Sequence, residues 1–504
     1  MYRRLSFALF VTFGFHGAMA TNWHVGPTQD FTLPSQVVGL VNNGDTIYLD
    51  GGVYSNDAVK WTKNNLVIIG LGTPDDPAVL QYSGDIPNHK GIFVFETPGD
   101  CDNAYIENIV FDGAQVSDAD GGNGAGIRYQ AKNLTVNHCI FRNCQNGILE
   151  GNGSVFDSNV IIINCEFYNN GYQVPDGTNS GYVHHMYISA STDTLLVTNC
   201  YFHHPRGQAN SLKTRAQRSY ILYNLIDEES TGYGSWELNI AQGGLNVVMG
   251  NVIIQGPSGA NHGIVGYDAV TNELQDFYFI NNTVINQYVG NVHFFNTAPA
   301  AGINTYKIYN NLFASVPGAN LVMFSGNEPA VLDSSNNIIS SDYLNVGFVN
   351  PSINDYALTA DALSAIDQGT LAGSTNSGYS LLPTSMYTSF DAVLQPRVVE
   401  GGAIDVGAYE YAVPIGTGNR LWRESQVFPN PNHGSFTWMP DPLLWSNACT
   451  FELFACDGTR RVERSIPNMG SSVVLDFQWL PEGVYLLRAV NAKGIFTTRV
   501  IIAH

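Results

Sequence analysis

The chain of 504 residues carries 43 Asp and Glu against 22 Lys and Arg, which gives a formal net charge of −21. This balance excludes general binding to nucleic acids or to anionic membranes, because both repel a strongly acidic protein. Charged residues are only 13% of the chain and aromatic residues 12%, with 51 glycines, so the composition predicts a glycine-rich β protein and not a disordered one.

The first 20 residues have the pattern of a secretion signal peptide. Arg3 and Arg4 precede the apolar stretch LSFALFVTFGF, and the small residues AMA end at Ala20. The apolar stretch is too short for a membrane span, and no later segment has about 18 uninterrupted apolar residues. The sequence therefore predicts a signal peptide at residues 1–20 and an exported protein with no transmembrane segment after its removal.

The middle of the chain repeats a short unit. Each unit ends in an apolar anchor residue, and successive anchors are 24 to 35 residues apart. Periods of this size indicate a solenoid, and the short β-branched and aromatic runs between Gly and Asn indicate strands and turns, not helices. The anchors are Phe111, Phe141, Phe167, Phe202, Ile226, Ile253, Val284, Phe313 and Ile339.

One position of the repeat is asparagine in five successive units. It lies two residues before the anchor and is occupied by Asn224, Asn251, Asn282, Asn311 and Asn337. Coils about 4.8 Å apart would let equivalent amides hydrogen-bond along the axis, and asparagine tolerates the left-handed backbone of a tight turn. The pattern therefore predicts an inward asparagine ladder in an all-β fold, a right-handed parallel β-helix of about ten coils.

Three earlier units place cysteine at the same position, as Cys139, Cys165 and Cys200. Seven cysteines in an exported chain suggest disulfides, but the number is odd. Stacked side chains with parallel Cβ vectors also hold two sulfur atoms poorly for a bridge. We therefore expect buried, unbridged thiols in this column.

Both ends of the repeat region resemble a known family. NWHVGPTQDFTLPSQVVGLVNNGDTIYLDGGVY resembles the start of many right-handed β-helix proteins, and DYALTADALSAIDQG and GGAIDVGAYEY resemble the segments that close their last coils. The resemblance spans about residues 21–411 and implies a β-helix with an N-terminal cap. A short amphipathic helix at residues 34–42 is expected to cover the open first coil.

Residues 412–427 are predicted to be a linker, and residues 428–504 a small β-sandwich. The pair Asp457-Gly458 between alternating runs is a strong hairpin signal. The order Pro-Asn-Pro, Asp-Gly, LPEGVY and a terminal apolar strand resembles the C-terminal sorting domain of the type IX secretion system. The resemblance implies the type IX machinery as a partner, and a place outside the cell or on the outer surface of a Gram-negative bacterium.

An acidic chain that gathers cations in SLKTRAQRS suggests a binding site for an acidic ligand. Side chains along a β-strand alternate between the core and the solvent. In the strands HHMYIS, SLKTRA and SWELNI, this alternation predicts that the apolar residues at every second position, Trp236 among them, point inside. The side chains expected outside, on three adjacent strands of one sheet, are His185, Tyr187, Lys213, Arg215, Glu237 and Asn239.

Two insertions, GYQVPDGTNSGYVHH and DEESTGYGS, flank these strands. Loops on one face of a solenoid commonly build its binding surface, and aromatic rings stack well on sugars. The residues expected to line the walls of the site are Tyr182, Tyr233, Tyr267 and Asp268, with Arg206 just upstream.

The segment HHMYIS to GNVIIQGP also resembles exported β-helix proteins and, distantly, polysaccharide lyases of the chondroitinase B and alginate lyase type. Those enzymes remove a proton beside a uronate carboxylate, which needs a base and a cation. The resemblance implies Lys213 as the base, Arg215 as the carboxylate ligand, and Tyr187 or His185 at the leaving oxygen. The implied substrate is an extracellular, acidic polysaccharide.

Three alternatives stay open. That lyase family places acidic Ca²⁺ ligands where this chain has Gln208 and Asn210, so no cofactor is certain, Ca²⁺ stays open, and no metal-binding residue is assigned. A glycoside hydrolase would need two carboxylates, for which Glu237 and Asp268 are the best pair. A non-catalytic glycan-binding or adhesive solenoid would need the cations only to bind the sugar.

Overall fold

The computed structural model describes residues 20–97, 99–151, 157–172, 182–261, 263–297, 302–325, 328–411, 426–428, 432–439, 449–455, 459–466, 473–491 and 494–502. All but the last residue of the predicted signal peptide, and most of the predicted linker, lie outside these ranges. The chain divides into two compact units, Met1–Tyr411 and Ala412–His504. Among the described residues, no helix has the length and apolarity needed to cross a bilayer.

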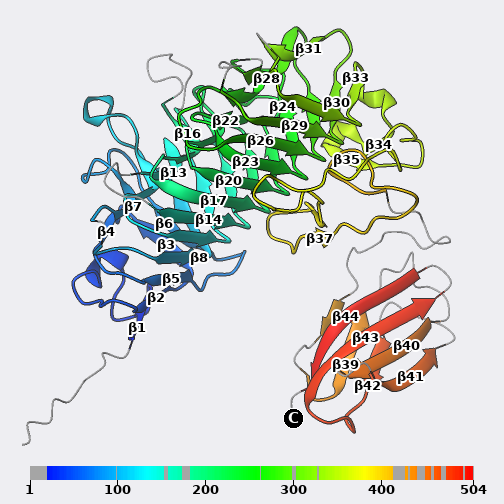
Figure 1. Cartoon of the computed structure of the whole chain (residues 1–504). Helices are drawn as coiled ribbons and strands as arrows, with labels where there is room; N and C mark the ends of the chain where they lie inside the picture. The colour runs from blue at the N-terminus through cyan, green and yellow to red at the C-terminus, as the bar shows by residue number, and fades with distance from the viewer. Residues whose placement is uncertain are drawn as a thin grey trace, which may run out of the picture. The chain divides into compact units, whose positions relative to one another are not determined.

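The first unit is built from three long parallel sheets, which we name A, B and C (Figure 1). They contain 12, 11 and 10 strands, and each turn of the chain adds one strand to each sheet in that order. Because crossovers between parallel strands are right-handed, the chain winds as a right-handed parallel β-helix, as the repeat predicts.

The strand bounds follow the sequence period. Sheet A contains β1 (Asn22–Val25), β2 (Thr46–Leu49), β5 (Val67–Gly70), β8 (Ala104–Glu107), β11 (Leu134–Asn137), β14 (Ser158–Ile163), β17 (Thr192–Thr198), β20 (Arg218–Leu222), β23 (Gly244–Met249), β26 (Gln275–Ile280), β29 (Thr305–Tyr309) and β32 (Leu332–Ser335). Sheet B contains β3 (Gly52–Ser55), β6 (Ala78–Gln81), β9 (Ile109–Asp112), β12 (Ile140–Arg142), β15 (Glu166–Tyr168), β18 (Tyr201–His203), β21 (Leu225–Asp227), β24 (Val252–Gln255), β27 (Thr283–Asn286), β30 (Leu312–Ser315) and β33 (Ile338–Ser340). Sheet C contains β4 (Val59–Trp61), β7 (Gly91–Phe95), β10 (Ala125–Tyr129), β13 (Asn146–Glu150), β16 (His184–Ile188), β19 (Asn210–Thr214), β22 (Leu238–Ile240), β25 (Gly263–Tyr267), β28 (Asn291–Thr297) and β31 (Asn320–Ser325).

The anchor residues form one line along sheet B. Register pairs each anchor from Phe111 to Ile339 with the next. The rings of the first four stack with centroids 4.7 to 5.0 Å apart. The anchors are buried through Phe313, but Ile339 is 58% exposed because β33 is the edge strand. The predicted buried line is therefore wrong at its last position.

The asparagine ladder is confirmed. From Asn224 to Asn337, each Nδ2 donates to the Oδ1 of the next asparagine at 2.9 to 3.0 Å. The same Oδ1 also accepts the backbone N–H of the asparagine before it. The left-handed backbone belongs to the preceding residue instead, with φ of 51° at Asn281 and 58° at Asn310.

The cysteine column is unbridged, as expected. Cys139, Cys165 and Cys200 are free and buried. Each thiol donates to nearby backbone carbonyls, at Sγ–O distances of 3.1 to 3.8 Å. Cys456 lies outside the described residues.

The N-terminal cap differs from the expected helix. Only a 3-10 turn, η1 (Pro34–Gln36), forms, and the chain then continues in turns. Gly39 and the β-branched Val37 and Val38 disfavour a longer helix. Val37 and Val41 are nevertheless buried in the main core, so the segment covers the first coil without helical structure.

After sheet B ends, the chain turns back along the outside of the coils. This return segment, residues 341–411, contains η3 (Tyr343–Asn345), β34 (Phe348–Asn350), η4 (Pro351–Ile353), β35 (Asp355–Leu358), β36 (Ser385–Met386) and β37 (Gln395–Pro396). One further 3-10 turn, η2 (Asp118–Asp120), lies in an earlier coil. Phe348 and Tyr356 pack on the outer face of sheet B, and Ala372 and Leu381 on that of sheet A. Among the described residues, no such apolar cluster covers the outer face of sheet C.

Side chains at the corner between sheets A and B hold the return segment. Asn336 donates to the Gln368 carbonyl at 2.6 Å, and Asn281 donates to that of Asp405 at 2.8 Å. Nearer the N-terminus, Asn199 donates to the Ala392 carbonyl at 2.7 Å. The return segment thus bonds to coils far apart in the solenoid.

The second unit is a small antiparallel β-sandwich (Figure 1). One sheet contains β38 (Gln426–Phe428), β39 (Ser435–Met439) and β42 (Val473–Asp476), and the other β41 (Arg460–Ile466), β40 (Cys449–Ala455), β43 (Gly483–Asn491) and β44 (Gly494–Ile502). Trp438 and Phe451 meet in its core with ring centroids 5.0 Å apart. β40 and β41 pair as a hairpin, as predicted, although the Asp-Gly pair itself lies outside the described residues.

Candidate functional site

The cationic strand lies on sheet C, the sheet whose outer face the return segment leaves uncovered. Register places Tyr187, Lys213 and Asn239 side by side on β16, β19 and β22. Lys213 lies between the buried Leu212 and Thr214, so its side chain points outward as alternation predicts. We name this surface, formed by Tyr187, Lys213, Arg215, Trp236 and Asn239, the Lys213 face.

Two cations lie over the ring of Tyr187. The Lys213 Nζ lies 5.8 Å from the ring centroid and the Arg215 Cζ 5.4 Å from it. Among the described residues, neither cation forms an ion pair. Burial, together with the neighbouring charge of Arg215, lowers the pKa of Lys213. Such a lysine gives up its proton more readily than an exposed one, which is the property a general base needs.

Asn239 and Asp268 extend the face toward the next coil. The Asn239 Nδ2 donates to the Asp268 Oδ2 at 2.8 Å. Asp268 is exposed, while Asn239 is buried and its Oδ1 has no partner among the described residues. An unpartnered amide oxygen and an exposed carboxylate are both acceptors for sugar hydroxyls.

Two aromatic residues close to Lys213 or Tyr187 were missed by sequence reasoning. Trp236 was expected inside, but its indole is only partly buried and lies across Gly263 and Gly266. A Cβ on Gly263 would come within 2.6 Å of the indole, so the ring needs the glycine. His184 stacks on Tyr187 with centroids 5.4 Å apart. In the sequence, the signal for this partly exposed ring was a tryptophan with glycines at the facing positions of the next coil.

His185 is not on the outer face, which corrects the prediction. It is fully buried, its Nδ1 lies 3.0 Å from the Asn170 Nδ2, and its ring approaches Phe202. Burial holds its pKa well below the usual range. The alternation of side chains between core and solvent fails at His185, because this residue lies at the start of β16, next to the turn between sheets B and C. His185 and Met186 are consecutive inward residues, as Gly147 on the coil before shows by facing Phe141 and Phe167.

Glu237 is also inside, for the same reason. It is 2% exposed and neither carboxylate oxygen has a partner among the described residues. Burial, with the nearby Glu228 carboxylate, holds its pKa well above the usual range. Since Asp268 is exposed, the two carboxylates do not form the pair on one face that a glycoside hydrolase would need.

The three tyrosines expected as walls of the site differ in their exposure. Tyr267 is fully buried and donates to the Gln275 Oε1 at 2.6 Å, so that prediction is wrong. Tyr182 is 75% exposed. Tyr233 is partly buried in a turn, where its N–H donates to the Pro205 carbonyl. Among the described residues, no hydrogen bond or ring contact joins any of the three to Lys213.

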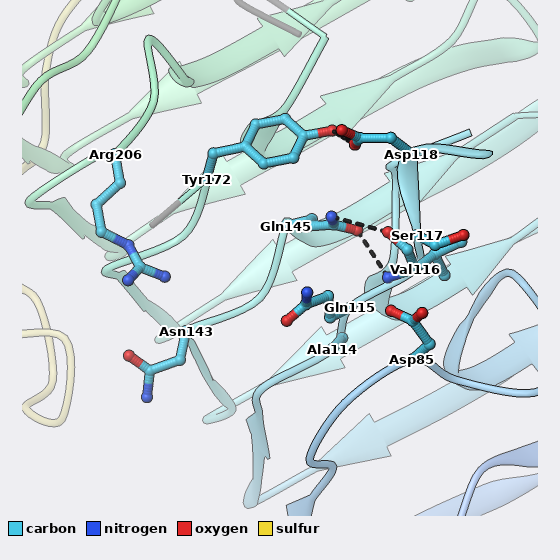
Figure 2. A pocket seen from close by; sticks show the side chains of 11 residues that line it. Asp85, Ala114, Gln115, Val116, Ser117, Asp118, Asn143, Gln145, Tyr172 and Arg206 are labelled. Atoms are coloured by element: carbon cyan, nitrogen blue, oxygen red, sulfur yellow. Dashed lines mark hydrogen bonds between the residues drawn. The ribbon is translucent and has the colours of Figure 1, made fainter. Parts of the chain in front are cut away.

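Arg206 lines a separate cavity of about 420 Å³ (Figure 2). The cavity lies in the turns that lead into the strands of sheet C. Its other lining residues are Asp85, Ala114, Gln115, Val116, Ser117, Asp118, Asn143, Gln145, Gly171 and Tyr172.

The described residues contain no group of three His, Cys, Asp or Glu side chains arranged to hold a metal ion. Asn210 is buried, and its Oδ1 has no partner among those residues. A single amide oxygen is a weak ligand for a hard cation.

Comparison with known families identifies the second unit. Residues 426–503 match the secretion system C-terminal sorting domain. The protein is therefore exported by type IX secretion to the outer surface of a Gram-negative bacterium or to its surroundings. Among curated proteins, none matches the sequence significantly.

The chain is also similar to several solved structures. The pectate lyase Pel9A is 14% identical with a TM-score of 0.48, and the match covers 79% of this chain and 98% of that one. The tailspike protein gp49 of Acinetobacter baumannii bacteriophage Fri1, a capsular polysaccharide depolymerase, is 10% identical with a TM-score of 0.38, over 97% and 81%. The PL6 family alginate lyase AlyGC is 14% identical with a TM-score of 0.28, over 79% and 58%. These names describe the activities of those proteins and not that of this chain.

Proposed function

We propose that the Lys213 face binds an acidic, uronate-containing polysaccharide and cleaves it by β-elimination. The observation that supports this most is the pair of cations near the ring of Tyr187, Lys213 and Arg215, neither of which forms an ion pair among the described residues. In a chain with a net charge of −21, two neighbouring cations that form no ion pair among the described residues provide a local site for an anion.

Each residue has a distinct role in the proposed reaction. Arg215 binds the uronate carboxylate through its guanidinium fork. The neutral amine of Lys213 takes the proton from the carbon beside that carboxylate. The electron pair left behind forms a carbon–carbon double bond, the glycosidic carbon–oxygen bond breaks, and the Tyr187 hydroxyl donates a proton to the leaving oxygen. Trp236, whose ring is partly exposed, would hold a neighbouring sugar ring by stacking.

The experiment is a turnover assay with acidic polysaccharides, followed by the ultraviolet absorbance of the unsaturated product. Lys213→Met should abolish turnover and keep binding, and Arg215→Met should weaken binding by about tenfold or more. Lys307→Met is the matched control, because Lys307 also lies over a tyrosine, 4.5 Å from the ring of Tyr309, but on sheet A. Turnover that survives in Lys213→Met would refute the assignment of the base.

A second candidate function is glycan binding without cleavage. The platform of Trp236 over Gly263 and Gly266 favours it, because stacking needs no base. In that case the wild type binds acidic glycans and forms no unsaturated product with any of them. Trp236→Ala should then weaken binding as strongly as Arg215→Met.

A further inference from the structure

The cavity beside Arg206 lies apart from the Lys213 face. Five successive coils contribute to it, the first through Asp85, which lies between β6 and β7. Gln115 and Asp118 lie before β10, Gln145 before β13, Tyr172 after β15, and Arg206 between β18 and β19. Its volume of about 420 Å³ falls within the roughly 300 to 1,000 Å³ of small-molecule sites.

The floor of the cavity is fixed by hydrogen bonds. The Gln145 Oε1 accepts the backbone N–H groups of Val116 at 2.9 Å and Gly124 at 2.7 Å, and its Nε2 donates to the Val116 carbonyl at 3.0 Å. The Tyr172 hydroxyl donates to the Gly122 carbonyl at 2.7 Å. These bonds tie neighbouring coils together, so the cavity is formed before any ligand binds.

The charges in the cavity are divided between two sides. Figure 2 shows Arg206 on one side and the carboxylates of Asp85 and Asp118 on the other. Arg206 is only partly exposed, its Nε is buried, and that nitrogen has no partner among the described residues. None of the described carboxylates forms an ion pair with Arg206.

A half-buried guanidinium without a partner is costly, since burial weakens its hydration and nothing replaces it. Burial also lowers the pKa of Arg206, which is the sign of this cost. A ligand carboxylate would restore the lost interactions with two parallel hydrogen bonds. Exposed carboxylates on the far side, such as Asp118 and Asp85, accept hydrogen bonds from hydroxyl groups.

We propose that this cavity is a second carbohydrate site, which binds one carboxylate-bearing sugar with its carboxylate on Arg206 and its hydroxyl groups toward Asp85 and Asp118. The ligand is either a free uronic acid or one uronate unit of a longer chain. The site does not depend on the chemistry of the Lys213 face, because no Lys213-face residue lines it.

The test is calorimetric titration of the full chain with D-glucuronate and D-galacturonate, with glucose and galactose as neutral counterparts. The wild type should bind at least one uronate and bind the neutral sugars more weakly. Arg206→Met should raise the Kd by about tenfold or more, and Arg206→Lys by less, because lysine keeps the charge but not the fork. Oligogalacturonides titrated in parallel identify the source, since binding of oligomers alone indicates a unit within a chain.

Two controls separate this site from the rest of the molecule. Arg218→Met removes a half-exposed arginine that pairs with Asp193 on sheet A, and it should leave uronate binding unchanged. Lys307→Met, which changes a lysine on sheet A, should also leave uronate binding unchanged. The proposal is overturned if the wild type binds neither uronates nor their oligomers, or if a folded Arg206→Met, shown by an unchanged melting temperature, binds them as tightly as the wild type.

Discussion

Two buried polar columns run along the inside of this β-helix, and they differ in how their polar atoms are satisfied. In the asparagine ladder between sheets A and B, every amide from Asn224 to Asn311 donates to the next residue of the column. In the inner column of sheet C, the successive residues His185, Ser211 and Glu237 are equally buried. There, His185 Nε2, Ser211 Oγ and both Glu237 oxygens have no partner among the described residues.

The difference shows what repetition does for a buried polar group. An amide is both donor and acceptor, so a column of identical amides at one spacing satisfies itself. Three different side chains at the same spacing have different lengths and cannot all reach their neighbours. Uniformity of residue type therefore makes the ladder a source of stability, whereas the mixed column is a cost that burial of its apolar neighbours must offset.

The largest effect is expected from interrupting the ladder with Asn282→Leu. The change removes the acceptor for the N–H and Nδ2 of Asn251 and a donor to the Val248 carbonyl. Because these groups stay buried, the free energy of unfolding should fall by roughly 3 kcal/mol. Urea denaturation measures it, with Leu312→Met outside the ladder as a control. An unchanged midpoint would contradict the ladder's contribution.

The second expectation concerns pH and the mixed column. The folded pKa of Glu237 is raised above 4.5, so above that pH the unfolded state binds fewer protons than the folded one. Stability from this group is thus complete below pH 4.5 and declines as pH rises, by about 1.4 kcal/mol per unit, until the folded pKa is passed. Glu228, with a pKa raised to about 8 by burial, contributes with the same sign.

The substitution Glu237→Gln removes one of the two titrating carboxyl groups. Its free energy of unfolding, measured from pH 4.5 to 7.5, should therefore decline less steeply than that of the wild type. Parallel pH profiles for the two proteins would show that Glu237 is ionised in the folded state.

The smallest effect is expected from Ser211→Ala. The Oγ of Ser211 is buried and has no partner among the described residues. Its removal should change the free energy of unfolding by less than about 1 kcal/mol, in the stabilising direction. Thermal melting of the variant measures this change. A loss of stability as large as that of Asn282→Leu would contradict the proposed difference between the two columns.

The same contrast explains what the sequence could predict. Anchors such as Phe141 and ladder residues such as Asn251 recur at one position of successive coils, so each repetition supports the others. The outward positions of Lys213 and Tyr187 followed from strict alternation along sheet C. His185 and Glu237 were misplaced because two consecutive residues face inward where the strand leaves a corner, which a period of two cannot represent.

The cavity beside Arg206 could not be predicted for another reason. Its lining comes from turns of five coils with no common motif, and only the three-dimensional stacking of the coils brings Asp85 and Arg206 to one cavity. The sequence identified Arg206 as a candidate binding residue because of its charge, but it did not show that Arg206 belongs to a site other than the Lys213 face. The position of Trp236 needed knowledge of Gly263 and Gly266 on the next strand.

The return segment changes how the molecule should respond to force. An array in which each coil touches only its neighbours can peel apart from its open end, one coil at a time. Here the chain turns back along the coils, and three of its backbone carbonyls accept hydrogen bonds from asparagine side chains of the coils. The pairs are Gln368 with Asn336, Asp405 with Asn281, and Ala392 with Asn199. A force applied at Tyr411 would have to break these hydrogen bonds before it could unwind the last coil. A protein at a cell surface would then resist shear as one body, and give way in a single step.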